Sequence, residues 1–183
     1  MAATKRLYSL TLRQEYPNLG SVKECKNLGG RALLQEDYGE DYDCTLTCLA
    51  FLFGSENYTL IERIAKRYGY SGTVSGTNPL TVKSVMKKVM QELKINGTPK
   101  SAYIKNVGFK WNTLKELLNS NHYVILNLST DGRDYYKNHS VTIIGYGEYK
   151  GANLLLVYDN WHTTVSYIDY DKMCSICSIN YYI

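Results

Sequence analysis

The sequence predicts an α+β fold in which helices fill the first two-thirds of the chain and an antiparallel sheet fills the last third. Apolar residues recur at helical spacing up to about residue 120, and β-branched or aromatic runs broken by turn residues follow from about residue 121. Helices and strands that are segregated along the chain are typical of α+β rather than alternating α/β domains. At 183 residues we expect one domain, 1–183, with a helical part at about 33–120 and a sheet part at about 121–183.

The first predicted helix carries a cysteine in its first turn. Asp43 is a candidate N-cap, so that Cys44 opens a helix running to about Phe53, where Gly54 ends it. The stretch before it, residues 1–32, is punctuated by glycine and is expected to form strands or loops that wrap the core.

The remaining elements follow from periodicity and turn signals. Three further helices are predicted at about Leu60–Tyr68, Leu80–Leu93 and Trp111–Leu118, separated by a loop at Ser71–Pro79 and a turn at Asn96-Gly97. Strands are predicted at Tyr123–Leu128, His139–Gly145, Asn153–Tyr158, Thr163–Tyr170 and Ile176–Ile183.

Composition argues against several functional classes. The net charge of +4 is spread along the chain, with no basic block that would indicate nucleic-acid binding. No stretch approaches the ~20 apolar residues that span a bilayer, so we expect no membrane span. The N-terminus has no apolar segment typical of a signal peptide. We therefore expect a cytoplasmic protein as the sequence stands, a secreted form remaining open if a signal has been removed.

The five cysteines leave at least one without an intramolecular partner. Cys174 and Cys177 form a lone CxxC, and a zinc site would need two more ligands such as Cys25 and His162. Ordinary buried thiols are favoured for this pair, a disulfide second and a metal third. We expect no cofactor and no metal.

Cys44, His139 and Asp159 are candidates for the three roles of a thiol-based catalytic site. A helix N-terminus stabilises an anion, which lowers the pKa of a thiol such as that of Cys44. His139 begins a predicted strand and Asp159 ends the next, so pairing of the two strands as a hairpin would place both residues at one end of the sheet. Gln35 or the backbone N–H of Cys44 is a candidate donor to an oxyanion. Each residue alone has a common structural explanation, namely a buried thiol, a capping histidine or a turn, whereas their order and contexts together favour a site.

These segments resemble those of the papain-like cysteine peptidases, most closely the bacterial group around the bacteriocin leader-processing peptidases that cut after double glycine. Gln35-Glu36-Asp37-Tyr38 with Asp43-Cys44 is similar to the motif that opens the family's central helix. The run from His139 to Tyr146 matches its His-x-Val-x-x-x-Gly-Tyr strand, and Val157-Tyr158-Asp159-Asn160-Trp161 is similar to its third segment.

The resemblance implies a papain-like fold with a central helix that bears Cys44 and packs on the C-terminal sheet. It also implies Cys44 as nucleophile, His139 as general base and acid, Asp159 as orienter and Gln35 as oxyanion donor. The chain departs from the family in three places: Gln35 and Cys44 are nine positions apart, Thr45 replaces a glycine, and Asn138 replaces another. It carries no ATP-binding motif, so it would be a stand-alone relative of the exporter-fused peptidases.

The expected function is a cysteine-dependent hydrolase that cleaves a peptide or related amide bond through an acyl-enzyme. Its expected partner is a peptide or protein substrate, and the oligomeric state stays open. Two alternatives use the same fold: an acyl or peptidyl transferase, and a catalytically inactive peptide-binding domain. A redox or zinc protein built on Cys174 and Cys177 is the least favoured.

Overall fold

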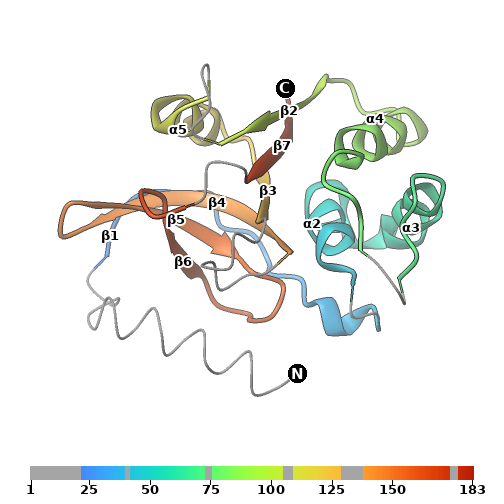
Figure 1. The fold of residues 1–183 in the computed structure, drawn as a ribbon, viewed down its shortest axis with the longest axis horizontal. Helices are drawn as coiled ribbons and strands as arrows, with labels where there is room; N and C mark the ends of the chain where they lie inside the picture. Colours follow the sequence, from blue (N-terminus) through green and yellow to red (C-terminus); the bar gives the residue numbers. More distant parts are fainter. Residues whose placement is uncertain (1–21, 40–41, 73–75, 105–108, 129–137, 174–176) are drawn as a thin grey trace.

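The computed structural model describes residues 22–39, 42–72, 76–104, 109–128, 138–173 and 177–183. Figure 1 shows three helices on one side of an antiparallel sheet and a fourth apart from them, which confirms the predicted α+β class. The helices are α2 (Cys44–Phe53), α3 (Tyr58–Lys66), α4 (Val82–Glu92) and α5 (Trp111–Asn119), with short 3-10 helices η2 (Gln35–Asp37) and η3 (Ser55–Asn57). The strands are β1 (Lys23–Asn27), β2 (Pro99–Tyr103), β3 (Val124–Leu128), β4 (His139–Tyr149), β5 (Ala152–Tyr158), β6 (Ser166–Asp169) and β7 (Ser178–Tyr182).

Helix α2 is the central helix and has the bounds that the sequence predicts. Eight of its ten residues are buried, as expected for a helix surrounded by other elements rather than lying on a surface. Gly54, with φ at 96°, ends it in a backbone conformation that a residue with a side chain rarely adopts. Helix α3 begins at Tyr58 and ends at Lys66, two residues earlier at each end than predicted.

The sheet has the strand order β2-β7-β3-β4-β5-β6, and within the described residues every pairing is antiparallel. Strand β4 is long enough to pair with β3 through its first half and with β1 through its second half. The sequence pattern predicts no strand between Asn96 and Trp111, yet β2 lies there and pairs with the C-terminal β7. A short strand that is stabilised by a partner about 80 residues away leaves little local signal.

The two faces of the sheet pack against different helices. Along β3, Val124, Leu126 and Leu128 join a core with Leu114 and Leu118 of α5. Ile125 points to the opposite face and joins the core formed by α2, α3 and α4. The continuous apolar run of β3 is therefore explained by burial on both faces, and α2 lies against one of them.

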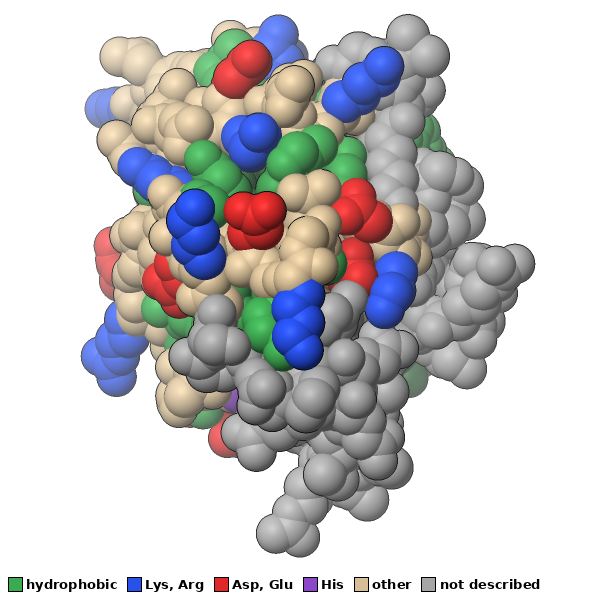
Figure 2. Space-filling view, turned by 90° about the vertical axis from the view of Figure 1, so that its left-hand side faces the viewer, with side chains coloured by type: hydrophobic (Ala, Val, Ile, Leu, Met, Phe, Trp, Pro, Cys, Tyr) green, Lys and Arg blue, Asp and Glu red, His purple; other side chains and the backbone are tan. Residues whose placement is uncertain are grey.

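The described surface mixes charges and apolar groups. Figure 2 shows basic and acidic side chains interspersed around hydrophobic ones on the face at the left of Figure 1. None of the helices in the described part of the chain is both long and apolar enough to cross a membrane.

Gly145 is expected to be needed for the pairing of β1 with β4. The register of β4 against β5 shifts between Ile143 and Gly145, and a Cβ at position 145 would collide with the main-chain oxygen of Lys26 on β1. We predict that Gly145→Ala lowers the free energy of unfolding by about 1–3 kcal/mol, because backbone must move to admit the methyl group. Urea denaturation measures this loss.

The matched control is Gly151→Asn in the β4–β5 turn, where a Cβ meets open space and asparagine tolerates the left-handed φ of 81°. It is expected to change stability by less than about 0.5 kcal/mol. Equal losses in both variants would contradict the close approach of β1.

Candidate active site

The helix that carries Cys44 begins at a buried aspartate. Asp43 occupies the N-cap position, as predicted, and its main-chain oxygen accepts the amide of Thr47 at 2.8 Å. Its carboxylate makes no capping bond and instead accepts hydrogen bonds from the hydroxyls of Tyr58 and Tyr70. Burial, followed by the bond to Asp43, raises the pKa of Tyr58, so this phenol remains a donor. These bonds fix the start of α2 to α3 and to the turn after it.

Cys44 is the first residue of α2 and is 9% exposed. Burial raises the pKa of its thiol, but the hydrogen bond and charge of His139 lower it, as does Ser140, and the net shift is downward. The unpaired N–H groups of the helix start favour the thiolate too. Cys48, one turn later, behaves oppositely, because burial raises its pKa to about 12. Of these two thiols, Cys44 is the one whose pKa is shifted toward the thiolate form.

His139 begins β4, and its imidazole ring has one contact at its edge and one on its face. Its Nε2 lies 2.7 Å from the main-chain oxygen of Asp159. Since a carbonyl only accepts, Nε2 carries the proton, and in the neutral ring Nδ1 is left as the basic nitrogen. The indole of Trp161 stacks on the imidazole with ring centroids 4.0 Å apart and planes inclined by 26°. The ring therefore has a defined tautomer and orientation.

Asp159 lies beside His139, as the hairpin argument predicts, because β4 and β5 pair with Thr142 opposite Tyr158. The carboxylate itself accepts hydrogen bonds within its own loop and from β6. Oδ1 accepts the amides of Trp161 at 3.0 Å and His162 at 2.9 Å. Oδ2 lies 2.8 Å from both Nδ1 of His162 and Oγ of Ser166. These four contacts match the roughly four acceptor sites of a carboxylate. The contact described between Asp159 and His139 runs through the main chain.

Gln35 is brought to the same loop from a distant part of the sequence. It begins η2, is 8% exposed, and donates its main-chain N–H to the oxygen of Asn160 at 2.9 Å. The structure thus gathers the segments of Cys44, His139, Asp159 and Gln35 at one end of the sheet.

Four polar side chains where α2 meets the sheet, those of Asn160, Thr45, Ser140 and Asn127, were not identified as site residues from the sequence. Asn160, only 3% exposed, adopts a left-handed φ of 62° and directs its amide at the carbonyl oxygens of Cys44 and Ser140. Thr45 contacts the hydroxyl of Ser140 at 2.7 Å, and Asn127 donates to the same hydroxyl at 2.7 Å. The signal for Asn160 was its place after a strand-ending aspartate, which by itself indicates only a turn.

The other cysteines of the described residues are Cys25, Cys48 and Cys177. Within the described residues there is no group of three or more His, Cys, Asp or Glu side chains that could hold a metal ion. Cys177 is fully buried just before β7, and Cys174 lies outside the described residues, so the state of this pair stays open.

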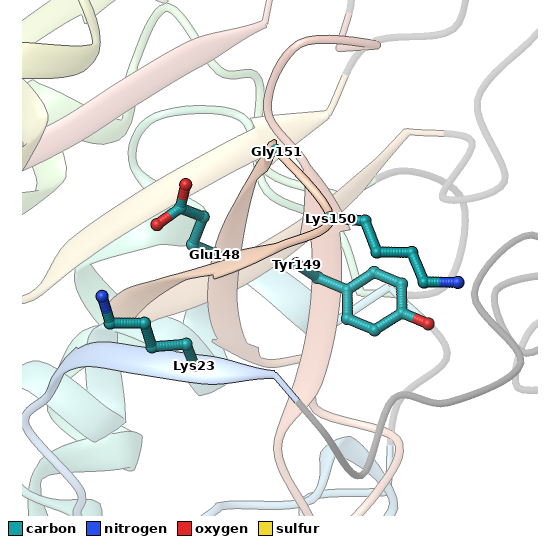
Figure 3. Close-up of a pocket in the computed structure, with 5 residues that line it drawn as sticks. All are labelled: Lys23, Glu148, Tyr149, Lys150 and Gly151. Atoms are coloured by element: carbon teal, nitrogen blue, oxygen red, sulfur yellow. The ribbon is translucent and has the colours of Figure 1, made fainter.

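A pocket of about 320 Å³ lies elsewhere, at the β4–β5 turn beside β1. Figure 3 shows its lining residues, Lys23, Glu148, Tyr149, Lys150 and Gly151. The Lys150 ammonium lies 5.3 Å from the centre of the Tyr149 ring. None of the candidate active-site residues lines this pocket.

No family model matches this chain, and no curated protein is significantly similar to it.

Replacing Asp159 separates the roles of its main chain and its carboxylate. Asp159→Asn keeps the carbonyl that holds His139 and an oxygen that can accept the amides of Trp161 and His162. We predict that iodoacetamide labels Cys44 of this variant at pH 6 within about tenfold of the wild-type rate. In a triad oriented by the carboxylate, the same change costs about four orders of magnitude in turnover. A loss of several hundredfold in the labelling rate would show that the carboxylate, rather than the carbonyl, orients His139.

Proposed function

We propose that this chain is a thiol hydrolase of papain-like fold that cleaves a peptide or related amide bond through an acyl-enzyme on Cys44. One observation carries the proposal: a buried thiol at a helix start has its pKa lowered by an imidazole whose far nitrogen is held by a main-chain carbonyl. A thiolate paired with an oriented imidazole is the arrangement that nucleophilic acyl transfer requires.

In the proposed reaction, Nδ1 of His139 takes the proton of the Cys44 thiol. The resulting thiolate sulfur adds to the substrate carbonyl, whose π electrons move to oxygen. His139 gives the proton on Nδ1 to the amine as the C–N bond breaks, leaving a thioester. A water molecule then adds to the thioester carbonyl while His139 takes one of its protons. Collapse of this second intermediate releases the carboxylic acid and the Cys44 thiolate.

The oxyanion formed in each step needs donors on the side of the start of α2. The main-chain N–H of Cys44 lies in the first turn, where helix N–H groups have no partner within the helix. We propose the side chain of Gln35 as the second donor, because the bond from its N–H to Asn160 brings η2 to this loop.

The papain-like arrangement is part of the proposal and is supported by how the elements meet. A helix beginning with the candidate nucleophile contacts β3 and β4, and β4 begins with the candidate base. The adjacent antiparallel strand β5 ends one residue before the acceptor of the base.

The labelling rate of Cys44 is expected to depend on His139. An ordinary thiol with a pKa of about 8.5 is only about 0.3% thiolate at pH 6. Because the pKa of Cys44 is lowered chiefly through His139, labelling should persist at pH 6 and fall only as the pH drops through the lowered pKa. We predict that His139→Ala slows iodoacetamide labelling of Cys44 at pH 6 at least tenfold, as measured by peptide mass spectrometry.

Two residues provide controls for this measurement. His122→Ala removes a histidine outside the site, and exposed Cys25 serves as an internal reference in every variant. Equal rates at Cys44 in wild type and His139→Ala would remove the basis of the proposal.

Turnover itself is tested with a library of proteome-derived peptides, with and without added glycine amide. New termini are expected with wild type and not with Cys44→Ala, read by mass spectrometry. Products extended by glycine amide in place of free carboxylates would identify a transferase. The absence of any product together with an activated Cys44 would favour the peptide-binding alternative.

A further inference from the structure

Asn160 contacts three of the segments that form the candidate site. Its Nδ2 lies 3.0 Å from the carbonyl oxygen of Cys44 and 2.9 Å from that of Ser140, the residue after His139. The main-chain carbonyl of Asn160 accepts the main-chain N–H of Gln35 at 2.9 Å. Asn160 also follows directly after Asp159, whose oxygen holds the imidazole.

The bonds are those of a rigid connection between helix and sheet. Asn160 is 3% exposed, and the two hydrogens of its amide nitrogen face three acceptors. These are the two carbonyl oxygens and, at 3.2 Å, the sulfur of Cys48. Buried hydrogen bonds of this kind hold one relative position, because losing any of them leaves a polar group without a partner.

The backbone of Asn160 explains why an asparagine serves here. Its φ of 62° is left-handed, a conformation that glycine adopts freely and asparagine tolerates better than most residues. Glycine would satisfy the backbone but would have no amide, so asparagine supplies both requirements. This separation makes the two roles experimentally distinct.

We infer that Asn160 is the positioning residue that sets the distance between the Cys44 sulfur and the His139 ring. This inference rests on the proposed function. One nitrogen atom of the amide donates both to the first turn of α2 and to the second residue of β4. The Cys44 sulfur and the His139 imidazole, which these elements carry, therefore keep a fixed separation. A shift of about 1 Å between reacting groups is enough to lower reaction rates about a hundredfold.

The test measures the rate of Cys44 labelling by iodoacetamide between pH 4 and pH 9 in folded variants. Asn160→Gly keeps the left-handed backbone and removes the amide. We expect at least tenfold slower labelling at pH 6 and a rise of about one unit in the pH at half-maximal rate. Asn160→Asp keeps the shape but replaces the donor with an acceptor, and it is expected to be at least as slow.

Asn180→Ala is the matched control, since it removes another fully buried amide of the sheet, one that donates to Asn127 at 2.8 Å. We expect Asn160→Gly and Asn180→Ala both to lower the melting temperature. Only the Asn160 variants are expected to shift the pH profile of Cys44 labelling. If Asn160→Gly does not fold, Asn160→Ser, which retains one donor, takes its place and is expected to fall between wild type and Asn160→Asp.

The outcomes separate the two hypotheses. If the pH profile of Asn160→Gly equals that of the wild type, and labelling still depends on His139, the role of Asn160 is overturned and the proposed function stands. A wild type in which labelling does not depend on His139 would overturn both. Equal shifts in Asn160→Gly and Asn180→Ala would show that only general stability is affected, which also overturns the inference.

Discussion

The hydrogen bonds of the Asn160 amide join the start of α2 to the start of β4, and the geometry of the candidate site depends on them. Cys44 and His139 come from parts of the chain almost a hundred residues apart, and their side chains meet only if helix and strand hold one position. Apolar packing between α2 and the sheet brings helix and strand together, but it is non-directional and does not fix their relative position. The amide supplies direction, because each hydrogen bond is lost when its donor and acceptor move apart.

The side chains around Asn160, between α2 and the sheet, are polar, and their hydrogen bonds also give the contact direction. Thr45, Ser140 and Asn127 form a buried chain of hydroxyl and amide contacts between helix and sheet. Taking such groups out of water costs free energy unless each finds a partner, so the chain stabilises only the arrangement in which the contacts are made. The hydroxyl of Thr45 is part of this network.

His139 illustrates how far sequence reasoning reaches. An apolar strand that begins with histidine, followed by a second that ends in aspartate, predicts an antiparallel pair with both residues at one end, and the pairing of β4 with β5 confirms it. The place of Cys44 at a helix start was predicted from Asp43 before it and from Gly54, which ends the helix. These inferences rest on local patterns and on one hairpin, which a sequence contains.

Other features depend on contacts that no local pattern encodes. The carboxylate of Asp159 accepts hydrogen bonds from Trp161 and His162 of its own loop and from Ser166 of β6, whereas its main-chain carbonyl contacts His139. The left-handed backbone of Asn160 and the pairing of β2 with β7 likewise arise from tertiary structure. The carboxylate of Asp43 was expected to cap α2, but two tyrosines from beyond the helix bind it instead.

The most direct test of the account is the position of the proton on His139, measured by imidazole ¹⁵N resonances in the wild type and in Cys44→Ala. We predict a proton on Nε2, bonded to the oxygen of Asp159, in both proteins. We also predict that removing the sulfur shifts the Nδ1 resonance while leaving that of Nε2 almost unchanged. A neutral ring protonated on Nδ1, or an Nδ1 resonance insensitive to Cys44, would contradict the pairing on which the proposed chemistry rests.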